Sequence, residues 1–156
     1  MDELSENDKQ LVNNIEIYGW HVIKVMEDEI GPGFGYSIGL FKTFGHPEII
    51  IIGLELDLIH LLINNIGEDI RNGKTFQAGQ YYPGIIESVN CFFTSVDKKH
   101  YAEYVSYAQW YYKDVEFPLL QCVYPIVKTI YPWQSDWPKE IKNQQPILGD
   151  INNSGQ

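Results

Sequence analysis

Basic residues are scarce in this chain. Its 156 residues include 11 Lys and Arg against 21 Asp and Glu, which leaves a formal net charge of −10 at pH 7. A protein that neutralises nucleic-acid phosphates needs clustered Lys and Arg, and so does one that binds anionic lipid. The composition therefore argues against nucleic acid and membrane surfaces as partners. It favours electrostatic steering toward a basic protein partner.

Cysteines and long apolar runs are also rare. Cys91 and Cys122 are far apart and lack metal-type spacing, so we expect reduced core thiols in a cytoplasmic protein, with a disulfide between them as the alternative. No stretch approaches the roughly 20 apolar residues of a membrane span. The first ten residues are polar and acidic and contain no apolar signal core, which also indicates a cytoplasmic protein.

The remaining composition is that of a folded domain. Hydrophobic residues make up 44% of the chain and charged residues 21%, which is typical of globular proteins. The length suits one domain, and no linker divides it. We therefore expect a single compact domain over residues 1–156, with frayed ends at residues 1–4 and 150–156.

Local patterns predict an α+β fold, with a mainly antiparallel sheet of five to six strands, two main helices and a short N-terminal helix. Alternating or apolar runs predict strands at residues 20–26, 34–41, 49–54, 75–82, 90–96 and 119–124. The S-x-x-D pattern from Ser5 to Asp8 begins the first helix, and Gly19 ends it. Asp57 and Asp97 are expected to cap the two main helices. The helix after Asp57 is expected to bury Leu58, Leu62, Ile66 and Ile70.

Several short blocks of the sequence are distinctive. They are Y-G-W-H-V-I-K-V, G-P-G-F-G-Y-S-I-G-L and F-G-H-P-E-I-I-I-I-G-L within residues 18–54, L-Q-C-V-Y-P at 120–125 and Q-P-I-L-G at 145–149. Together they resemble a bacterial family known as domain of unknown function 4262. The resemblance spans nearly the whole chain. It implies a stand-alone bacterial domain and brings no established activity or catalytic residues.

The block G-H-P-E is the sharpest chemical feature. Gly45 permits a positive φ, and Pro47 holds the residue before it extended, so a stiff loop should present His46 and Glu48 beside Tyr36. Such a loop could bind a ligand or move a proton, since histidine titrates near neutral pH. The alternative is that His46 and Glu48 bond backbone groups and lock a hairpin corner.

Other chemical motifs give little support for catalysis. His21 is expected on the apolar face of the first strand as a satisfied core residue, although a two-histidine site is conceivable if it reaches His46. No third ligand has metal-type spacing, so no metal site is expected. The glycines at residues 31–39 lack the spacing of a phosphate-binding loop, and Ser37 is not on a nucleophile elbow.

Aromatic residues are abundant, at 14% of the chain. Exposed Tyr and Trp beside acidic residues favour a surface for a protein partner. The candidates for this surface are Trp110, Tyr112, Trp133 and Trp137. The alternative is that the aromatic residues cover the sheet as a second small core.

Two functions are consistent with these observations. The favoured one is a non-catalytic binding protein, similar to an antitoxin or immunity protein that binds a basic target. The alternative is a small-molecule-binding protein or enzyme with its site at residues 36–48. That segment loosely resembles the strand–loop–strand that cradles flavin in split-barrel flavin reductases, with Lys42, Thr43 and Lys74 as the few anchors for a phosphate. The sequence leaves enzymatic activity open, and the missing catalytic motifs argue against it.

Overall fold

A computed structural model describes residues 4–151, which form an α+β structure around one mixed sheet. The strands of this sheet are β1 (His21–Val25), β2 (Phe34–Ile38), β3 (Glu48–Ile52), β4 (Gln80–Pro83), β5 (Asn90–Ser95) and β6 (Leu119–Val123). The helices are α1 (Glu6–Tyr18), α2 (Leu40–Phe44), α3 (Leu56–Arg71), α4 (Tyr101–Tyr104) and α5 (Ser106–Tyr112), with single 3-10 turns η1 (Lys98–His100) and η2 (Lys139–Ile141). The predicted fold class is confirmed.

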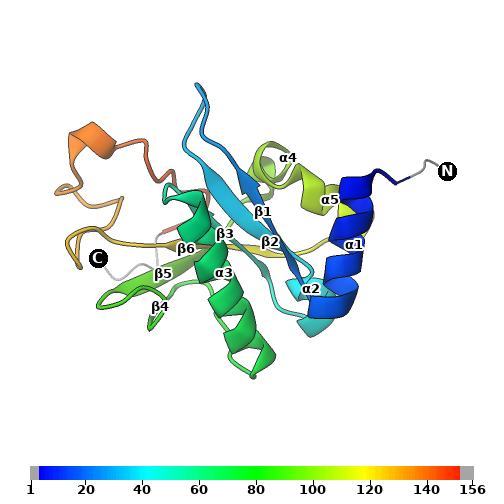
Figure 1. The fold of residues 1–156 in the computed structure, drawn as a ribbon. Helices are drawn as coiled ribbons and strands as arrows, with labels where there is room; N and C mark the ends of the chain where they lie inside the picture. The colour runs from blue at the N-terminus through cyan, green and yellow to red at the C-terminus, as the bar shows by residue number, and fades with distance from the viewer. Residues whose placement is uncertain (1–3, 152–156) are drawn as a thin grey trace.

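The sheet consists of two antiparallel meanders joined by a parallel pair. Its strand order is β1-β2-β3-β6-β5-β4, and the parallel pair is β3 with β6 (Figure 1). In that pair Glu48 lies opposite Leu119, and Ile50 lies opposite Gln121. The two central strands therefore come from different halves of the chain.

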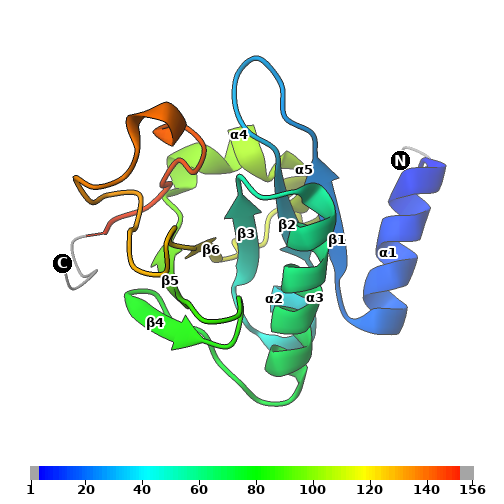
Figure 2. The same cartoon turned by 60° about the vertical axis from the view of Figure 1, so that its left-hand side comes forward.

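Helices cover both faces of the sheet (Figures 1 and 2). Side chains alternate across a strand, so Ile49 and Ile51 of β3 pack in the core cluster under α3, whereas Ile50 and Ile52 pack in the opposite cluster with α1 and α5. Each buried isoleucine contributes about 1.5–3 kcal/mol. The continuous apolar run thus forms a central strand buried on both faces, as its sequence predicts.

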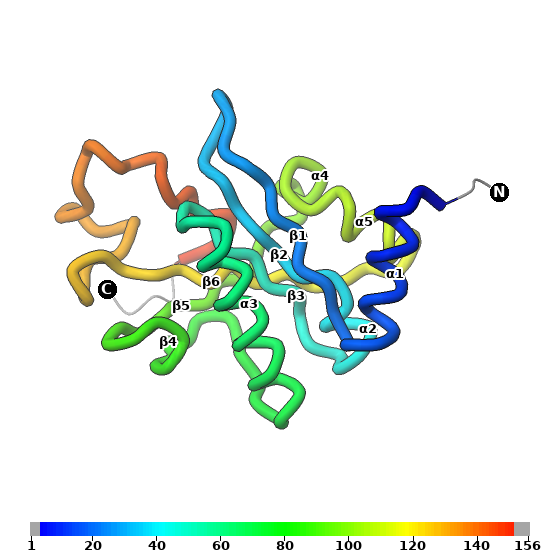
Figure 3. Tube along the Cα trace, in the orientation of Figure 1, coloured from blue at the N-terminus to red at the C-terminus, as the bar shows by residue number. Residues whose placement is uncertain are grey.

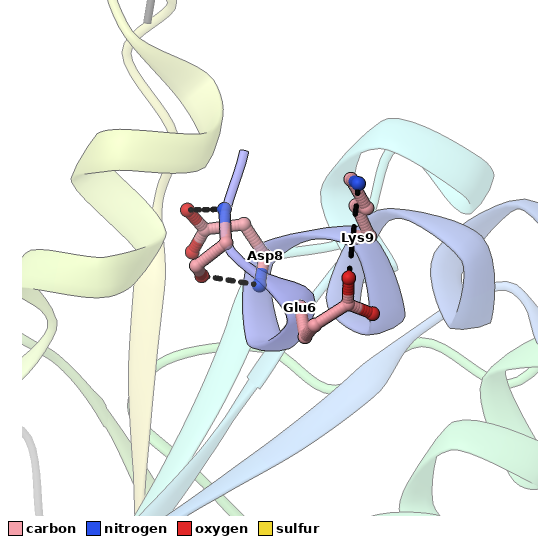
Figure 4. Close-up of polar contacts among 4 residues, drawn as sticks. Glu6, Asp8 and Lys9 are labelled. Atoms are coloured by element: carbon pink, nitrogen blue, oxygen red, sulfur yellow. Dashed lines mark hydrogen bonds and ion pairs between the residues drawn. The ribbon is translucent and has the colours of Figure 1, made fainter. Parts of the chain in front are cut away.

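The N-terminal helix α1 has the predicted boundaries. The Ser5 hydroxyl accepts a hydrogen bond from the Asp8 amide, and the Asp8 carboxylate accepts one from the Ser5 amide, beside an ion pair between Glu6 and Lys9 (Figure 4). This reciprocal pair satisfies two amides that the first turn leaves without helical partners. At the other end Gly19 has a φ of 103° and caps the helix.

The second strand is shorter than predicted. It ends at Ile38, because Gly39 adopts a φ of 119° and starts the five-residue helix α2. A Cβ atom at Gly39 would lie 2.7 Å from the carbonyl oxygen of Gly19, so this close approach requires glycine. The prediction that the strand continues to residue 41 is therefore wrong.

The first main helix also departs from its predicted pattern. Its N-cap is Glu55 and not Asp57, and Leu58 is exposed. The face of α3 that packs on the sheet instead carries Ile59, Leu62, Ile63, Ile66, Gly67 and Ile70. The buried stripe thus begins one residue later than the i+4 series predicted.

The second half of the chain is more irregular than its sequence suggests. The predicted strand at residues 75–82 is reduced to β4. Asp97 does cap the next segment through a bond from the Lys99 amide, but that segment begins as η1. The helix is then interrupted at Val105, whose φ of −125° is not helical, so two short helices replace one.

The segment after β6 loops away from the sheet and returns to it (Figure 3). Two glutamine side chains hold the returning segment against the sheet through hydrogen bonds. Gln145 accepts from the Tyr124 amide and donates to the Tyr124 carbonyl, while Gln121 donates to the Pro146 carbonyl. The Asp150 carbonyl accepts a hydrogen bond from the Thr94 hydroxyl. Residues 1–3 and 152–156 of the predicted frayed ends lie outside the described residues.

Cys91 on β5 and Cys122 on β6 are both buried free thiols. Both side chains lie in the core as predicted, and the Cys122 thiol is close enough to hydrogen-bond Cys91, so their reduced state stays a prediction. Among residues 4–151, no helix combines the length and apolar character needed to cross a membrane.

Candidate functional site

Glu48 is the most constrained residue of the predicted loop. It is the first residue of β3, and its side chain is fully buried. Three backbone amides and two hydroxyls donate to its carboxylate. The donors are Ser37 Oγ at 2.7 Å, the amides of Gly39, Leu40 and Phe41 at 2.9–3.2 Å, and the Tyr112 hydroxyl. The carboxylate therefore holds the first turn of α2 against β2 and β3.

The directions of these hydrogen bonds indicate which protonation state of the Glu48 carboxylate the site favours. Ser37 Oγ accepts from the Ile49 amide, and the Tyr112 oxygen accepts from the Lys42 amide, so both hydroxyl hydrogens are left to bond Glu48. Every partner of the carboxylate is a donor, which suits the ionised form. Burial raises the pKa of Glu48, and the bonds from Tyr112, Ser37 and the backbone oppose this. The carboxylate has no vacant position from which to serve an external ligand.

His46 is likewise engaged within the protein. Its Nε2 accepts from the Phe76 amide at 3.0 Å, which leaves the hydrogen on Nδ1 to bond the Pro47 carbonyl at 2.8 Å. Burial lowers the pKa of this imidazole, in agreement with a neutral ring. These contacts support the structural interpretation of the loop, in which His46 fastens it to the segment that follows α3.

Tyr36 does not join His46 in one site. Tyr36 is buried in the core cluster with α1 and α5, and burial raises its pKa to about 12. The His46 ring instead packs against Phe76, which belongs to the cluster under α3. All three side chains pack in the interior, so the loop does not present His46 and Glu48 beside Tyr36 at the surface.

His21 also has other partners than the sequence suggested. Its Nδ1 lies 3.0 Å from the Asn14 amide nitrogen, and its pKa is lowered by burial and by nearby His60. It lines a hollow of about 480 Å³ between α1 and α3. Sequence reasoning missed Asn14, His60 and Asn64 of this hollow. The spacing in the sequence was the available signal. Asn14 is four residues after Gln10, and Asn64 is four residues after His60, so each pair lies on one face of its helix.

The four predicted surface aromatics divide into two groups. Tyr112 and Trp137 are buried, so they do not contribute to an exposed surface. The Tyr112 hydroxyl is bonded to Glu48, and the Trp137 indole donates to the Ile141 carbonyl. Trp110 and Trp133 are half-buried.

Trp133 supports the second-core interpretation of the aromatic residues. Its ring stacks on Tyr131 at 5.2 Å and meets Phe92 edge-on at 5.3 Å, in a small cluster separate from the two main ones. Trp110 packs with Tyr107 on α5, beside the ammonium group of Lys113. Most of the aromatic excess therefore serves packing.

The β1–β2 hairpin is the most prominent projection of the molecule (Figures 1 and 2). Its tip is ordered by Asp28, whose carboxylate accepts from the amides of Ile30 and Gly31 at 2.9 and 3.0 Å. The Asp28 amide donates in turn to the Gly31 carbonyl at 3.0 Å. Within this ordered tip, the Ile30 side chain is 87% exposed. The hairpin thus presents an apolar side chain on a fixed acidic turn.

Two hollows flank this hairpin. One, of about 530 Å³, lies between Met26 and Glu27 on one side and Glu55 and Asp57 on the other. A smaller one, of about 180 Å³, is lined by Ile30 and other hairpin residues together with Glu103 and Tyr104 at the end of α4. Within residues 4–151 no group of three or more His, Cys, Asp or Glu side chains is arranged to bind a metal ion.

Comparison with known families agrees with the blocks quoted from the sequence. Residues 14–138 match the model of the family described as Domain of unknown function (DUF4262). The chain belongs to this family. Searches of curated proteins and of solved structures returned no match.

In this DUF4262 domain, the sequence blocks that carry the resemblance supply hydrogen bonds that hold the fold together. Ser37, Gly39 and Glu48 come together at α2, His46 bonds the Phe76 amide, and Gln121 bonds the returning tail. These blocks therefore serve the fold, and membership of the family assigns no activity. Exposed surfaces that do not take part in these hydrogen bonds are the better candidates for a binding or catalytic site.

Proposed function

We propose that this domain is a non-catalytic binding protein that recognises a basic protein partner through its β1–β2 hairpin, in the manner of a small acidic antitoxin or immunity protein. One observation carries the proposal. Ile30, 87% exposed, stands at a hairpin tip that three hydrogen bonds around Asp28 hold in place.

An apolar side chain in this position is suited to anchor a partner. Met26, on the same hairpin, is 77% exposed, and its thioether adapts to irregular surfaces. Binding energy concentrates in a few anchors surrounded by polar contacts. A tip already ordered in the free protein loses little conformational entropy on binding, which raises affinity.

The charges around the hairpin specify the chemistry of the partner. Glu27, Asp28 and Glu29 are consecutive, and Glu55 and Glu103 line the flanking hollows. The nearest cation on the hairpin, Lys24, is 3.7 Å from Asp57 and is already paired. Such a surface attracts a basic protein and makes association faster at low salt.

The enzyme alternative has less support from the geometry. Tyr36, His46 and Glu48 are all buried, and His46 and Glu48 are bonded to neighbouring groups. A flavin at this segment requires that part of the fold to open. Thermal unfolding with added flavin mononucleotide is therefore expected to show an unchanged Tm, whereas a rise of several degrees favours the flavin alternative.

The hairpin proposal is tested by comparing matched surface variants in capture from the native host. Ile30→Ser and the double variant Glu27→Lys/Glu29→Lys alter the tip. The control, Val127→Ser, alters an apolar residue elsewhere that is 78% exposed. A basic protein should be retained by wild type and Val127→Ser and lost with both tip variants. Its affinity, measured with the two purified proteins, should fall steeply with salt.

Two results would count against the proposal. One is a partner that binds the wild type and Ile30→Ser equally. The other is a partner whose affinity does not change with salt. Circular dichroism of each variant confirms that its fold is intact.

A further inference from the structure

A separate hollow of about 480 Å³ lies along the outer edge of the sheet. The strand at this edge, β1, pairs with β2 alone, and it lies between α1 and α3 (Figure 2). The two helices pack on opposite faces of the sheet. The hollow is therefore formed by three elements that the fold holds in place, and its volume is in the range of small-ligand sites.

The uncharged polar part of the lining consists of groups that both donate and accept hydrogen bonds. They are the carboxamides of Gln10, Asn14 and Asn64 and the imidazoles of His21 and His60. Gln10 and Asn14 are four residues apart on α1, and so are His60 and Asn64 on α3. This spacing places each pair on one face of its helix.

Two internal bonds fix how these groups are presented. The Trp20 indole can only donate, so its 2.9 Å bond identifies the Asn64 oxygen and leaves the Asn64 nitrogen to donate. The Asn14 side-chain nitrogen lies 3.0 Å from His21 Nδ1 and donates to it. The His21 hydrogen is then on Nε2, and the Asn14 oxygen is left to accept a hydrogen bond from a ligand. The hollow thus offers donors and acceptors side by side, which matches the dual capacity of hydroxyl groups.

The charged groups at the hollow are already paired with one another. Arg71 lies 3.3 Å from Glu68, donates to the Tyr18 carbonyl and stacks over the Trp20 ring at 5.0 Å. Lys24 and Asp57, which act on His60, are also paired. Burial lowers the pKa of both imidazoles, which keeps them neutral near pH 7. The lining therefore carries no net charge in a chain whose net charge is −10.

We propose that this hollow is a binding site for an uncharged polyhydroxylated ligand of monosaccharide to disaccharide size. The carboxamides and imidazoles bond its hydroxyl groups. The Tyr18 ring, 61% exposed at the rim, provides an apolar surface for the C–H face of a sugar ring. None of its lining residues belongs to the hairpin tip around Ile30, and the site does not depend on a protein partner.

The test is a titration of ¹⁵N-labelled protein, followed by amide chemical shifts, with defined sugars. The neutral probes are glucose, galactose, N-acetylglucosamine, maltose and lactose. The matched charged probes are glucose 6-phosphate and galacturonate. At least one neutral probe should give saturable shifts confined to α1, β1 and α3, and glucose 6-phosphate and galacturonate should bind more weakly than glucose and galactose.

Neighbouring asparagines on α1 provide a matched pair of variants. Asn14 lines the hollow, whereas Asn13 is exposed and does not line it. Asn14→Ala should weaken binding about tenfold, the effect of one or two hydrogen bonds, and Asn13→Ala should leave it unchanged. If Asn14→Ala does not fold, Gln10→Ala, at an exposed position, replaces it with the same expected direction.

Three results overturn the proposal. They are the absence of saturable shifts with every neutral probe at about 50 mM, tighter binding of a charged probe than of its neutral counterpart, and equal weakening by Asn13→Ala and Asn14→Ala. None of them affects the hairpin proposal, because Ile30 and its acidic neighbours lie outside this hollow.

Discussion

The hydroxyl of Tyr112 donates a hydrogen bond to the carboxylate of Glu48, 64 residues earlier in the chain. This bond connects α5 to the first residue of β3 and completes the set of donors around a buried charge. Burial also raises the pKa of Tyr112, together with the adjacent negative charge, so its hydroxyl stays protonated and available to donate. The pair joins the two halves of the chain at the point where α2 begins.

Replacing Glu48 with glutamine should be strongly destabilising. The amide nitrogen then meets amide and hydroxyl donors, and several of them lose their acceptor. We expect Glu48→Gln to lower the free energy of unfolding by about 3–5 kcal/mol, measured by urea denaturation. Glu87→Gln, at an exposed position, is the control and should have little effect. A loss below about 1 kcal/mol for Glu48→Gln would contradict the anchoring role.

Removing only the Tyr112 hydroxyl should cost less. Tyr112→Phe deletes one donor to the charged group and leaves the Lys42 amide without its acceptor, so we expect a loss of about 1.5–3 kcal/mol. Tyr111→Phe, on the same helix, controls for the loss of a hydroxyl. In a double-mutant cycle, the combination with Glu48→Gln should destabilise less than the sum of the two single variants. Additive losses would show that the two residues act independently.

The His46 imidazole should make stability depend on pH. Burial lowers its pKa below the ordinary 6.5, so the unfolded chain binds this proton more readily than the folded protein. The resulting stabilisation is fully present above pH 6.5 and is lost as the pH falls through the folded-state pKa. His46→Gln retains an acceptor for the Phe76 amide and lacks the titrating group.

Urea unfolding of wild type and His46→Gln at several pH values measures this dependence, and the other titrating groups cancel in the difference. The stability advantage of the wild type should shrink between about pH 7 and pH 5. An advantage that stays constant or grows on acidification would show that His46 does not titrate as proposed.

Gly39 should not tolerate a side chain. Its φ of 119° disfavours alanine, and the added Cβ would lie 2.7 Å from the Gly19 carbonyl oxygen and 2.9 Å from the Trp20 Cα atom. We expect Gly39→Ala to cost about 3–5 kcal/mol in thermal or urea unfolding, from backbone strain plus overpacking. Gly73 has a φ of 101° with no atom within 4 Å of the added Cβ, so Gly73→Ala reports the strain alone. Equal losses for the two variants would exclude the close contact as a cause.

The elements that the sequence predicted well are those determined by a few adjacent residues. The reciprocal cap at Ser5 and Asp8 and the left-handed Gly19 fix both ends of α1 within one turn each. The apolar run of β3 was predicted from local residues, because a short run of four β-branched isoleucines favours a strand buried on both faces.

The elements that the sequence did not predict depend on distant partners. Helix α2 has only five residues and is held by Glu48 from the following strand, so its own residues resemble a continued strand. G-H-P-E was recognised as the sharpest block, yet its role depends on Phe76 and Tyr112, which are remote in sequence. The hollow at β1 combines side chains from α1 and α3, and only the folded sheet brings them together.

The parallel pairing of β3 with β6 also sets the order in which the protein can assemble. The antiparallel pairs are closer in sequence than the β3–β6 pair, whose junction requires the long connection from residue 53 to residue 118 to close. Until then β3 is an exposed sheet edge made largely of isoleucine. Such an edge pairs readily with other chains, so the partly folded state is the one most prone to aggregate. Conditions that slow the closure of this junction should therefore lower the yield of refolded protein.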